Sequence, residues 1–574
     1  MSLTQRLLDV SDVTQNEKNN DTHSCRESSE PATTTEPNAS HVAVPVPSAS
    51  LNQESFESGR ESLVIWGVTI ACAVALLTWD AVIYKTWTGP LGIFVTLTIG
   101  LLLLAKVGGS FAVVPNVQAL WRSDGKLEPL DGLRAIAVLW VLGTHMIGYV
   151  SWRGGPACAN HLLKLVIFEY IGNGDMGVDI FFVLSGYLIS YLLMKEWRRD
   201  GGINTARFLW RRWLRITPTY AFAVALELIV GRGWGPGSTI RASCSKYWWS
   251  TMLFLNNYYY HTPVVFAPWE CLGQAWSIAT EFQFYLISPI IIWVTMARKV
   301  PMYLTAFLLT GLALFLRWYF FQKYGVTGEV SAQLFVYDKV YTRMPPYLAG
   351  MAAAHIFLES SGPTKSPLQS MGRWARWSLH GVFSVVWAVS SFFGEWGKVY
   401  LGDHYFYQDG MPDPLGKACY ISARAFFGLS VAYFALMTIW GKARLMKWFL
   451  TMPVWRPFAR LSYGAYVLQH VIIDPTVDWI NFDVSESQGT CLWKLIVFMS
   501  ISIGMTFILA FFANIFVEQP IMRMRDRLTP SWEWLRHRSV GVISQVAYAG
   551  ILVWLLYESI TYVPGGKDYV YRQE

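Results

Sequence analysis

The sequence predicts an all-α fold: a multi-pass transmembrane helical bundle of about 10–13 spans that follows a disordered amino-terminal tail. Of its 574 residues, 53% are apolar and only 15% are charged, whereas soluble proteins carry about 25% charged residues. Aromatic residues make up 16% of the chain, which excludes a disordered protein, a coiled coil and a nucleic-acid-binding tail protein. The net charge of +7 indicates little until the charges are located.

Four segments follow one another along the chain. Residues 1–60 are polar and rich in Ser, Thr, Asn and Pro, without the apolar core of a signal peptide, so we expect a disordered cytosolic tail. Residues 61–107 hold two candidate transmembrane helices. Residues 128–528 form the main membrane domain, and residues 529–574 hold a final transmembrane helix and a tail.

The spans are predicted from apolar runs, since a helix needs about 20 mostly apolar residues to cross about 30 Å of hydrocarbon. Thirteen runs approach that length. They are Leu63–Trp79, Gly89–Ala105, Leu133–Trp152, Met176–Met194, Ile216–Gly231, Ile278–Ala297, Val300–Leu316, Met344–Leu358, Trp377–Phe393, Ile421–Trp440, Leu461–Ile480, Leu495–Val517 and Val540–Tyr557. They predict an integral protein of the plasma membrane or an endomembrane, surrounded by membrane lipids.

The charges between the runs predict which loops face the cytosol. Lys195–Arg215, Gly441–Arg460 and Glu518–Arg538 are rich in Lys and Arg, whereas the intervening loops carry acids. Because cytosolic loops are enriched in basic residues, this alternation places the amino terminus inside and the carboxyl terminus outside. The glycosylation sequons at Asn20 and Asn38 would be used only with the opposite orientation.

Five of the seven cysteines fall in or beside predicted outer loops. An oxidising compartment would permit disulfides there, most plausibly among Cys158, Cys244 and Cys271, although isolated small apolar residues would explain the cysteines equally well. The sequence offers no metal-binding spacing of His and Cys, so we expect no metal.

Ionisable side chains inside the spans are expensive to insert and are therefore candidates for function. Arg134 and His145 stand eleven residues apart in the third span, which places them within about 20° of one helix face and about 16 Å apart along it. A snorkelling arginine and a histidine bonded between helices would give the same pattern.

Two acids enter the membrane from the outer side, where His145 is expected to arrive. They are Asp179 in the fourth span and Glu281 in the sixth, with Gln283 two residues deeper than Glu281. A carboxylate at this depth would orient the imidazole and raise its basicity. Asp179 would also be favoured, without any such role, by the dipole at the start of its helix.

Basic side chains gather at the inner side. Arg212 and Arg215 are i,i+3 neighbours whose guanidinium groups could together bind a phosphate. Arg134 is expected at the same depth in the membrane. Ordinary enrichment of cytosolic loops in arginine explains them individually. His470, in the middle of a span, would either line a cavity or bond a neighbouring helix.

Together these layers predict a basic, phosphate-binding mouth on the cytosolic side and a histidine about 16 Å further out. That separation is comparable to the pantetheine arm of coenzyme A, so the thioester of a nucleotide-anchored donor would reach His145. The same buried charges would also suit a multi-pass transporter of a phosphate-bearing or lipid-like substrate.

Several ordered motifs carry a family resemblance. They are Leu130–His145, Gly177–Ser190, Phe208–Pro218 and Ala275–Pro289, with weaker echoes in Arg343–Ala354, Leu461–His470 and Val517–Pro520. With these motifs the chain resembles the acyltransferase 3 family of integral-membrane acyltransferases, and within it the eukaryotic branch of nose-resistant-to-fluoxetine proteins. One departure is Glu281-Phe282, where bacterial members usually have two adjacent acids.

The resemblance implies an O-acyltransferase that moves an acyl group, often acetyl, from cytosolic acyl-CoA to a hydroxyl of a carbohydrate or lipid acceptor, without a tightly bound cofactor. It makes His145 the catalytic histidine, Arg134 its paired arginine, and Arg212 with Arg215 the donor-binding pair. We assign Asp179 and Glu281 to the catalytic group as well. The substrate-binding set is completed by Arg343, Gln283 and His470.

Overall fold

The structure is a computed structural model, and its chain divides into two compact units, Met1–Ser110 and Phe111–Glu574. It describes residues 113–123, 125–153, 166–230, 240–259, 271–324, 333–361, 366–392, 407–408, 411–412, 414–482, 487–528, 550, 553–554 and 557, all in the second unit. The predicted tail 1–60, the two candidate spans in 61–107 and most of the final span Val540–Tyr557 lie outside these residues.

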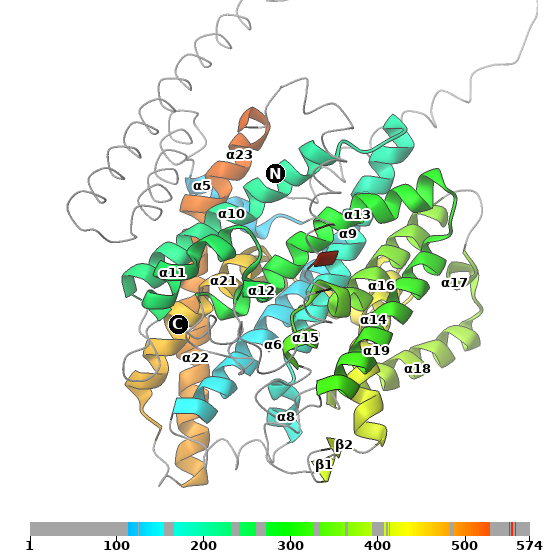
Figure 1. The fold of residues 1–574 in the computed structure, drawn as a ribbon. Helices are drawn as coiled ribbons and strands as arrows, with labels where there is room; N and C mark the ends of the chain where they lie inside the picture. The colour runs from blue at the N-terminus through cyan, green and yellow to red at the C-terminus, as the bar shows by residue number, and fades with distance from the viewer. Residues whose placement is uncertain are drawn as a thin grey trace, which may run out of the picture. The chain divides into compact units, whose positions relative to one another are not determined.

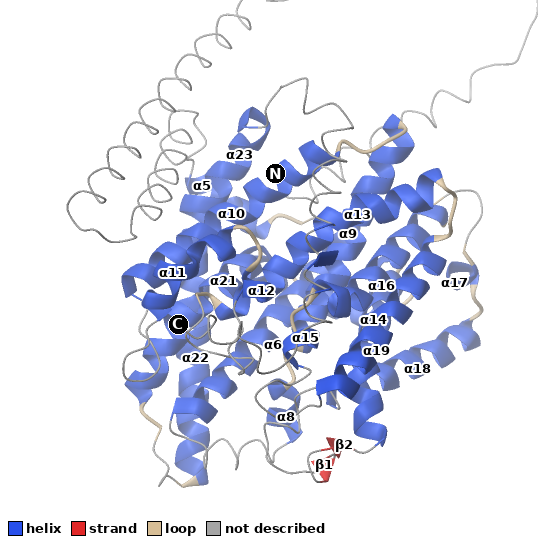
Figure 2. Cartoon of the chain, viewed as in Figure 1, coloured by secondary structure: helices blue, strands red, loops and turns tan. Residues whose placement is uncertain are grey.

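The described residues are almost entirely helical, which confirms the predicted all-α fold class (Figures 1 and 2). The longer helices are α5 (Val113–Trp121), α6 (Glu128–Arg153), α9 (Met176–Asp200), α10 (Thr205–Val230), α11 (Ile240–Met252), α13 (Trp276–Ala297), α14 (Met302–Tyr324), α16 (Val340–Glu359), α18 (Arg373–Phe392), α19 (Pro414–Ile439), α21 (Trp455–Ile480), α22 (Gln488–Ala513) and α23 (Gln519–Leu528).

Short elements connect these helices. They are η1 (Gly125–Leu127), α8 (Val166–Gly172), α12 (Asn256–Tyr259), η2 (Gly273–Ala275), α15 (Gln333–Val336), α17 (Pro367–Ser370), α20 (Arg444–Leu450) and the π-helical turn η3 (Asn514–Glu518). The strands β1 (Tyr407–Gln408) and β2 (Met411–Pro412) form one antiparallel pair. Helix α5, in a stretch to which the sequence assigned no element, packs on α21, and its Asn116 donates to the Ile515 carbonyl.

Within the described residues, six helical segments are long and apolar enough to cross a membrane. They are Glu128–Val150, Met176–Asp200, Gly273–Ala297, Met302–Tyr324, Lys417–Ile439 and Gly489–Arg525. Four other predicted spans fall on α10, α16, α18 and α21, which are helical but carry charged residues such as Arg212, Arg343, Arg373 and Asp474. The total of about 10–13 spans stays a prediction.

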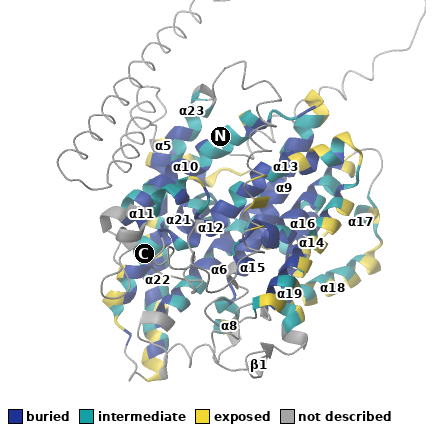
Figure 3. Ribbon diagram, in the orientation of Figure 1, coloured by how far each residue is buried: buried dark blue, intermediate teal, exposed yellow. Residues whose placement is uncertain are grey.

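Four of the six segments, on α13, α14, α19 and α22, present large apolar side chains outward. Phe307, on α14, is 74% exposed, and Phe315 on α14 with Ile508 and Phe512 on α22 are also exposed. In contrast, α6, α9 and α16 are mostly buried (Figure 3). Such long apolar faces would be unfavourable in water and are satisfied by lipid hydrocarbon. The chain is an integral membrane protein.

Helices α9 and α16 pack with their backbones close together, because each has a glycine where the two helices touch. A Cβ atom on Gly186 would collide with the Tyr347 carbonyl oxygen, and one on Gly350 would collide with the Val183 carbonyl oxygen. Small residues permit this approach between membrane helices. The two helices run parallel, with Asp179 bonded to Arg343 near their starts and Arg198 to Glu359 near their ends.

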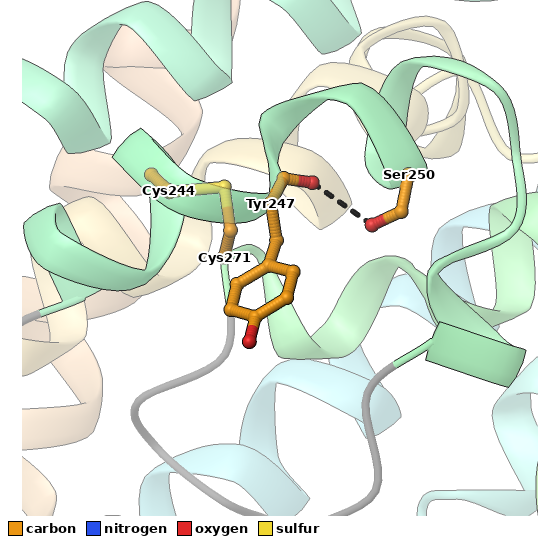
Figure 4. The surroundings of a disulfide bond; sticks show 4 residues. All are labelled: Cys244, Tyr247, Ser250 and Cys271. Atoms are coloured by element: carbon orange, nitrogen blue, oxygen red, sulfur yellow. Dashed lines mark hydrogen bonds between the residues drawn. A yellow bond between two sulfur atoms is a disulfide. The ribbon is translucent and has the colours of Figure 1, made fainter. Parts of the chain in front are cut away.

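A disulfide joins Cys244 of α11 to Cys271, just before η2 (Figure 4). Near it, Ser250 donates a hydrogen bond to the Tyr247 carbonyl oxygen at 2.8 Å. The predicted disulfide among the outer cysteines is therefore confirmed for this pair, and Cys491 is also disulfide-bonded. The bridge ties the connection between α10 and α13 to the start of α13, where several site residues lie.

Candidate functional site

The site is built on two parallel neighbouring helices, α6 and α21. Their starts are joined by Arg456, whose Nε donates to Glu128 at 2.8 Å. One turn further along α21, Arg460 approaches Asp131 at 3.9 Å, and Asp131 also accepts from Arg134 at 2.8 Å. These ion pairs fix the register of the two helices and bring the arginines of both to one end.

The same two helices bring two histidines together further along. His145 of α6 and His470 of α21 meet edge to face, with ring centroids 5.2 Å apart. Arginine and histidine therefore occur in the same order on both helices: Arg134 and His145 on α6, Arg460 and His470 on α21. Eleven helical residues correspond to about 16 Å of rise, so the arginine end and the histidine layer are separated by that distance.

The histidine layer consists of His145, His470, Gln469 and Tyr149. His145 Nδ1 lies 2.8 Å from the Gln469 side-chain oxygen, and the Tyr149 hydroxyl lies 3.3 Å from His470 Nδ1. His470 Nε2 is buried without a hydrogen-bond partner among the described residues. His145 Nε2 likewise has no described partner, so both imidazoles keep one ring nitrogen available to a ligand.

Tyrosines of α21 continue this polar face toward the arginine end. The Tyr466 hydroxyl lies 2.6 Å from Ser277 Oγ and donates to the Gln274 carbonyl oxygen at 2.6 Å. One turn earlier, the Tyr463 hydroxyl donates to the Ile216 carbonyl oxygen at 2.7 Å. Spacings of three residues place these side chains in a row on one helix face, which connects the arginine end with the histidine layer.

Arg212 occupies the arginine end from the side of α10. Its guanidinium lies 5.6 Å from the Phe208 ring centroid and 5.9 Å from that of Tyr285. Its Nε is buried and has no described hydrogen-bond partner. Burial lowers the pKa of Arg212 to about 10, so it still carries its charge at neutral pH. Arg215, on the same helix, interacts electrostatically with the carboxylate of Glu518. Arg460 of α21 interacts with the same carboxylate.

Glu281 belongs to this arginine end and not to the histidine layer. It accepts a hydrogen bond from the hydroxyl of Tyr285, one helical turn further along α13, and the Tyr285 hydroxyl also accepts from Ser185 at 3.3 Å. Its carboxylate acts electrostatically on Arg212. Among the described residues Glu281 has no hydrogen bond to His145, and its expected role beside that ring stays a prediction.

Asp179 is also absent from the histidine layer, and it does not orient His145 as the sequence had suggested. It is fully buried and accepts from Arg424 of α19 at 2.6 Å and from Arg343 of α16 at 3.3 Å. Arg424 additionally bonds Asp175. These four residues form a buried ion cluster. Its net charge is zero, because the two arginines neutralise the two aspartates.

Two predicted substrate-binding residues have other partners. Arg343, in the ion cluster, is fully buried between the rings of Trp276 and Tyr337, at 4.8 and 4.6 Å from their centroids. Gln283 donates at 2.9 Å to both the Phe254 carbonyl and the side chain of Asn257. Both side chains fix the connections that lead into α13 and α16, and neither lies in the histidine layer.

Sequence reasoning missed several residues of the ion cluster, the arginine end and the histidine layer, among them Asp175, Arg424, Arg460, Gln469 and Tyr149. Arg460 had a usable signal, because it precedes His470 by ten residues much as Arg134 precedes His145 by eleven. Gln469 adjoins His470, yet only the packing of α21 on α6 shows that it reaches His145. Among the described residues, no three His, Cys, Asp or Glu side chains group as a metal site.

Comparison with known proteins identifies the family. A family model described as an acyltransferase domain matches residues 128–515, which covers α6 to the middle of η3 and includes every predicted site residue. The chain belongs to this acyltransferase family. Its motifs are therefore those of the resemblance noted in the sequence, and the predicted membrane domain 128–528 begins at the same residue as the match.

Three relatives illustrate the family. Nose resistant to fluoxetine protein 6 of Caenorhabditis elegans is 21% identical over 71% of this chain and 52% of its own length. The O-acetyltransferase OatA of Staphylococcus aureus is 28% identical over 40% of this chain and 35% of its own. The peptidoglycan O-acetyltransferase OatA of Listeria monocytogenes is 26% identical over 69% and 55%.

The chain thus spans about a third to just over half of the length of these curated relatives. No solved structure matches it.

Proposed function

We propose that this protein is a membrane O-acyltransferase that moves an acyl group, in the form of acetyl, from cytosolic acyl-CoA to a hydroxyl of a carbohydrate or lipid acceptor at the outer or lumenal side. The observation that carries the proposal is the pair of parallel helices α6 and α21, which hold arginines at one end and two facing histidines about 16 Å further along. Membership of the acyltransferase family and the O-acetyltransferase relatives support the reaction class.

The arginine end would bind the donor. Arg212 keeps a buried donor nitrogen without a protein partner, and Arg215 lies on the same face of α10. Charged guanidinium groups form strong, directional hydrogen bonds with phosphate oxygens. Arg134 lies at this end and not beside His145, so in this mechanism it positions the donor and does not stabilise charge at the acyl carbon.

The histidine layer would carry out the transfer. His145 Nε2 takes the proton of the acceptor hydroxyl while the hydroxyl oxygen forms a bond to the thioester carbonyl carbon. The carbon–sulfur bond then breaks, and the imidazolium returns the proton to the leaving thiolate. His470, 5.2 Å away, offers its buried Nε2 to the acceptor. No step requires a metal or a tightly bound cofactor.

The transporter alternative receives less support from the arrangement of charges. Asp175, Asp179, Arg343 and Arg424 pair with one another, whereas a path for ions or charged substrates needs groups that exchange partners. Arg212 Nε and His470 Nε2, in the proposed site, are buried without a described hydrogen-bond partner.

The test is to replace His145 by Ala and to supply acetyl-CoA, labelled in its acetyl group, to the cytosolic face of membrane vesicles that contain their own lipids and glycans. We expect labelled product to fall by about 10²- to 10⁴-fold, the usual contribution of a general base. His380→Ala is the matched control, because His380 bonds Tyr433 between α18 and α19, away from the site. Full transfer by the His145→Ala variant would refute the proposal.

A further inference from the structure

We propose that Gln469 is a positioning residue that selects the tautomer of His145, so that Nε2 is the ring nitrogen which carries the lone pair. This inference rests on the proposed acyl transfer at His145. The structure supports it through one geometric fact: the amide of Gln469 is held in a single orientation, and in that orientation its oxygen faces the imidazole.

The orientation of the amide follows from its two contacts. Gln469 Nε2 donates to the carbonyl oxygen of Tyr466 at 2.9 Å, and Gln469 Oε1 lies 2.8 Å from His145 Nδ1. Exchanging the two ends would set an oxygen against the Tyr466 carbonyl oxygen, two acceptors with no proton between them. The side chain is also fully buried, so it cannot rotate away from His145.

The tautomer of His145 follows from the amide. A glutamine oxygen can only accept a hydrogen bond, so His145 Nδ1 must supply the proton. A neutral imidazole carries one proton, which leaves the lone pair on Nε2, the nitrogen without a described partner. The other groups that face this ring are the imidazole of His470, 5.2 Å away, and the more distant carboxylate of Asp175, which is itself paired with Arg424.

This assignment has a consequence for the reaction step. When Nε2 takes the acceptor proton, the ring becomes an imidazolium, and the Nδ1–H bond to Gln469 strengthens as the charge forms. When the imidazolium returns the proton to the leaving thiolate, the original neutral tautomer is restored. Gln469 thus performs, without a charge of its own, the orienting role that the sequence had assigned to Asp179 or Glu281.

The first test compares two substitutions of similar size, Gln469→Glu and Gln469→Met, in the labelled acetyl-CoA vesicle assay. Glutamate keeps an acceptor for Nδ1–H, whereas methionine does not. We expect Gln469→Met to lower kcat about 10- to 100-fold with little change in the KM for acetyl-CoA, and Gln469→Glu to retain more activity than Gln469→Met. Thr476→Ala is the control, because Thr476 of α21 bonds the Ile472 carbonyl of its own helix and no other side chain among the described residues.

A merely structural role predicts the opposite order, because burying a new carboxylate costs more than burying a thioether. Activity of Gln469→Met equal to or above that of Gln469→Glu would therefore overturn the inference. If the unmodified protein and its His145→Ala variant transferred equally, the proposed function itself would fail, and this outcome is distinct from an effect confined to Gln469.

A second measurement does not depend on activity. The protein, labelled with ¹⁵N-histidine and placed in lipid nanodiscs, would give imidazole nitrogen signals that distinguish the tautomers, with His145→Ala identifying the signals of His145. We expect the Nδ1–H tautomer in the unmodified protein and a mixture in Gln469→Met. The Nε2–H tautomer, or a doubly protonated ring at neutral pH, would overturn the inference.

Discussion

Two polar regions lie inside the same helical bundle and differ in how their charges are satisfied. In the ion cluster of Asp175, Asp179, Arg343 and Arg424, every charged group has an opposite charge at salt-bridge distance. In the region between the arginine end and the histidine layer, buried nitrogen atoms of Arg212 and His470 have no partner among the described residues. Arg343 Nη2 and Asp175 Oδ1 of the ion cluster are also buried without a described hydrogen-bond partner, so the two regions differ in charge pairing: the cluster's charges are matched, whereas Arg212 has no carboxylate at salt-bridge distance among the described residues.

The difference separates structural polar groups from functional ones better than burial or membrane depth does. Both regions are buried and both contain arginines, so the cost of insertion alone would mark each as functional. A buried charge that is paired holds helices in place, because removing one partner leaves the other uncompensated. A buried cation without an opposite charge beside it has a cost that a bound anionic substrate can remove, so substrate affinity is expected there.

Replacing Arg343 by Met should have the largest effect on stability. It leaves one negative charge in excess in the ion cluster, and breaking a buried pair typically costs about 3–5 kcal/mol. The double variant Arg343→Met with Asp179→Leu should regain most of this, because Arg424 and Asp175 remain as a neutral pair. The measurement is the unfolding temperature in detergent micelles.

The control for this prediction is Arg373→Met, at the exposed start of α18. The comparison between the two regions would break if Arg343→Met left the unfolding temperature unchanged and raised the KM for acetyl-CoA. Arg343 would then bind substrate, as the sequence had suggested.

Much of the fold was predictable, because the length and apolar content of membrane helices are dictated by the bilayer and can be recognised locally. The helical register of Arg134 and His145 was predictable for the same reason, since both lie on α6. The Cys244–Cys271 bridge was one of the pairings considered for the outer cysteines. These features depend on residues close in sequence or on the side of the membrane that a loop faces.

The partners of Asp179 and Glu281 were not predictable, because membrane depth does not specify the direction in which a side chain points. Asp179 turns toward α16 and α19, where Arg343 and Arg424 stand 164 and 245 residues later in the chain. Glu281 turns toward Tyr285 and α10. Which helices become neighbours is decided by close contacts such as Gly186 with Gly350, and a single sequence does not reveal them.

Replacing Arg212 and Arg215 together by Ala should act mainly on substrate binding. Hydrogen bonds from charged groups contribute about 1.5–3 kcal/mol each, so we expect the KM for acetyl-CoA to rise by about 10- to 100-fold. Arg212→Ala alone should hardly lower the unfolding temperature, because it removes a buried guanidinium with an unsatisfied nitrogen, whereas Arg215→Ala also takes a cation from the buried Glu518. Initial rates at varied acetyl-CoA give KM, and calorimetry with free CoA gives the affinity.

Arg199→Ala with Arg207→Ala is the matched control, since both arginines are exposed on the same basic stretch. An equal rise in the KM for acetyl-CoA from this pair would show that the general positive charge of the cytosolic face is sufficient to bind the donor. In that case Arg212 and Arg215 would not be distinguished from their neighbours as donor ligands.

The smallest effect is expected from Tyr285→Phe, which tests what keeps Arg212 from pairing with Glu281. The Tyr285 hydroxyl donates to Glu281 and lies beside Arg212, so it holds the carboxylate away from a full ion pair with that arginine. Without the hydroxyl, Glu281 is free to neutralise Arg212. A single hydrogen bond is worth about 0.5–1.5 kcal/mol, so we expect the KM for acetyl-CoA to rise about 2- to 10-fold with kcat unchanged, as measured by initial rates.

Adding Glu281→Gln to Tyr285→Phe should restore the KM, because an amide cannot neutralise Arg212. Tyr433→Phe is the control, since the Tyr433 hydroxyl bonds His380 between α18 and α19 at 2.9 Å. If Tyr285→Phe instead lowered the unfolding temperature and left KM unchanged, Tyr285 and Glu281 would belong with the ion cluster among the stabilising groups. Arg212 would then owe its availability to its backbone position and not to a competing hydrogen bond.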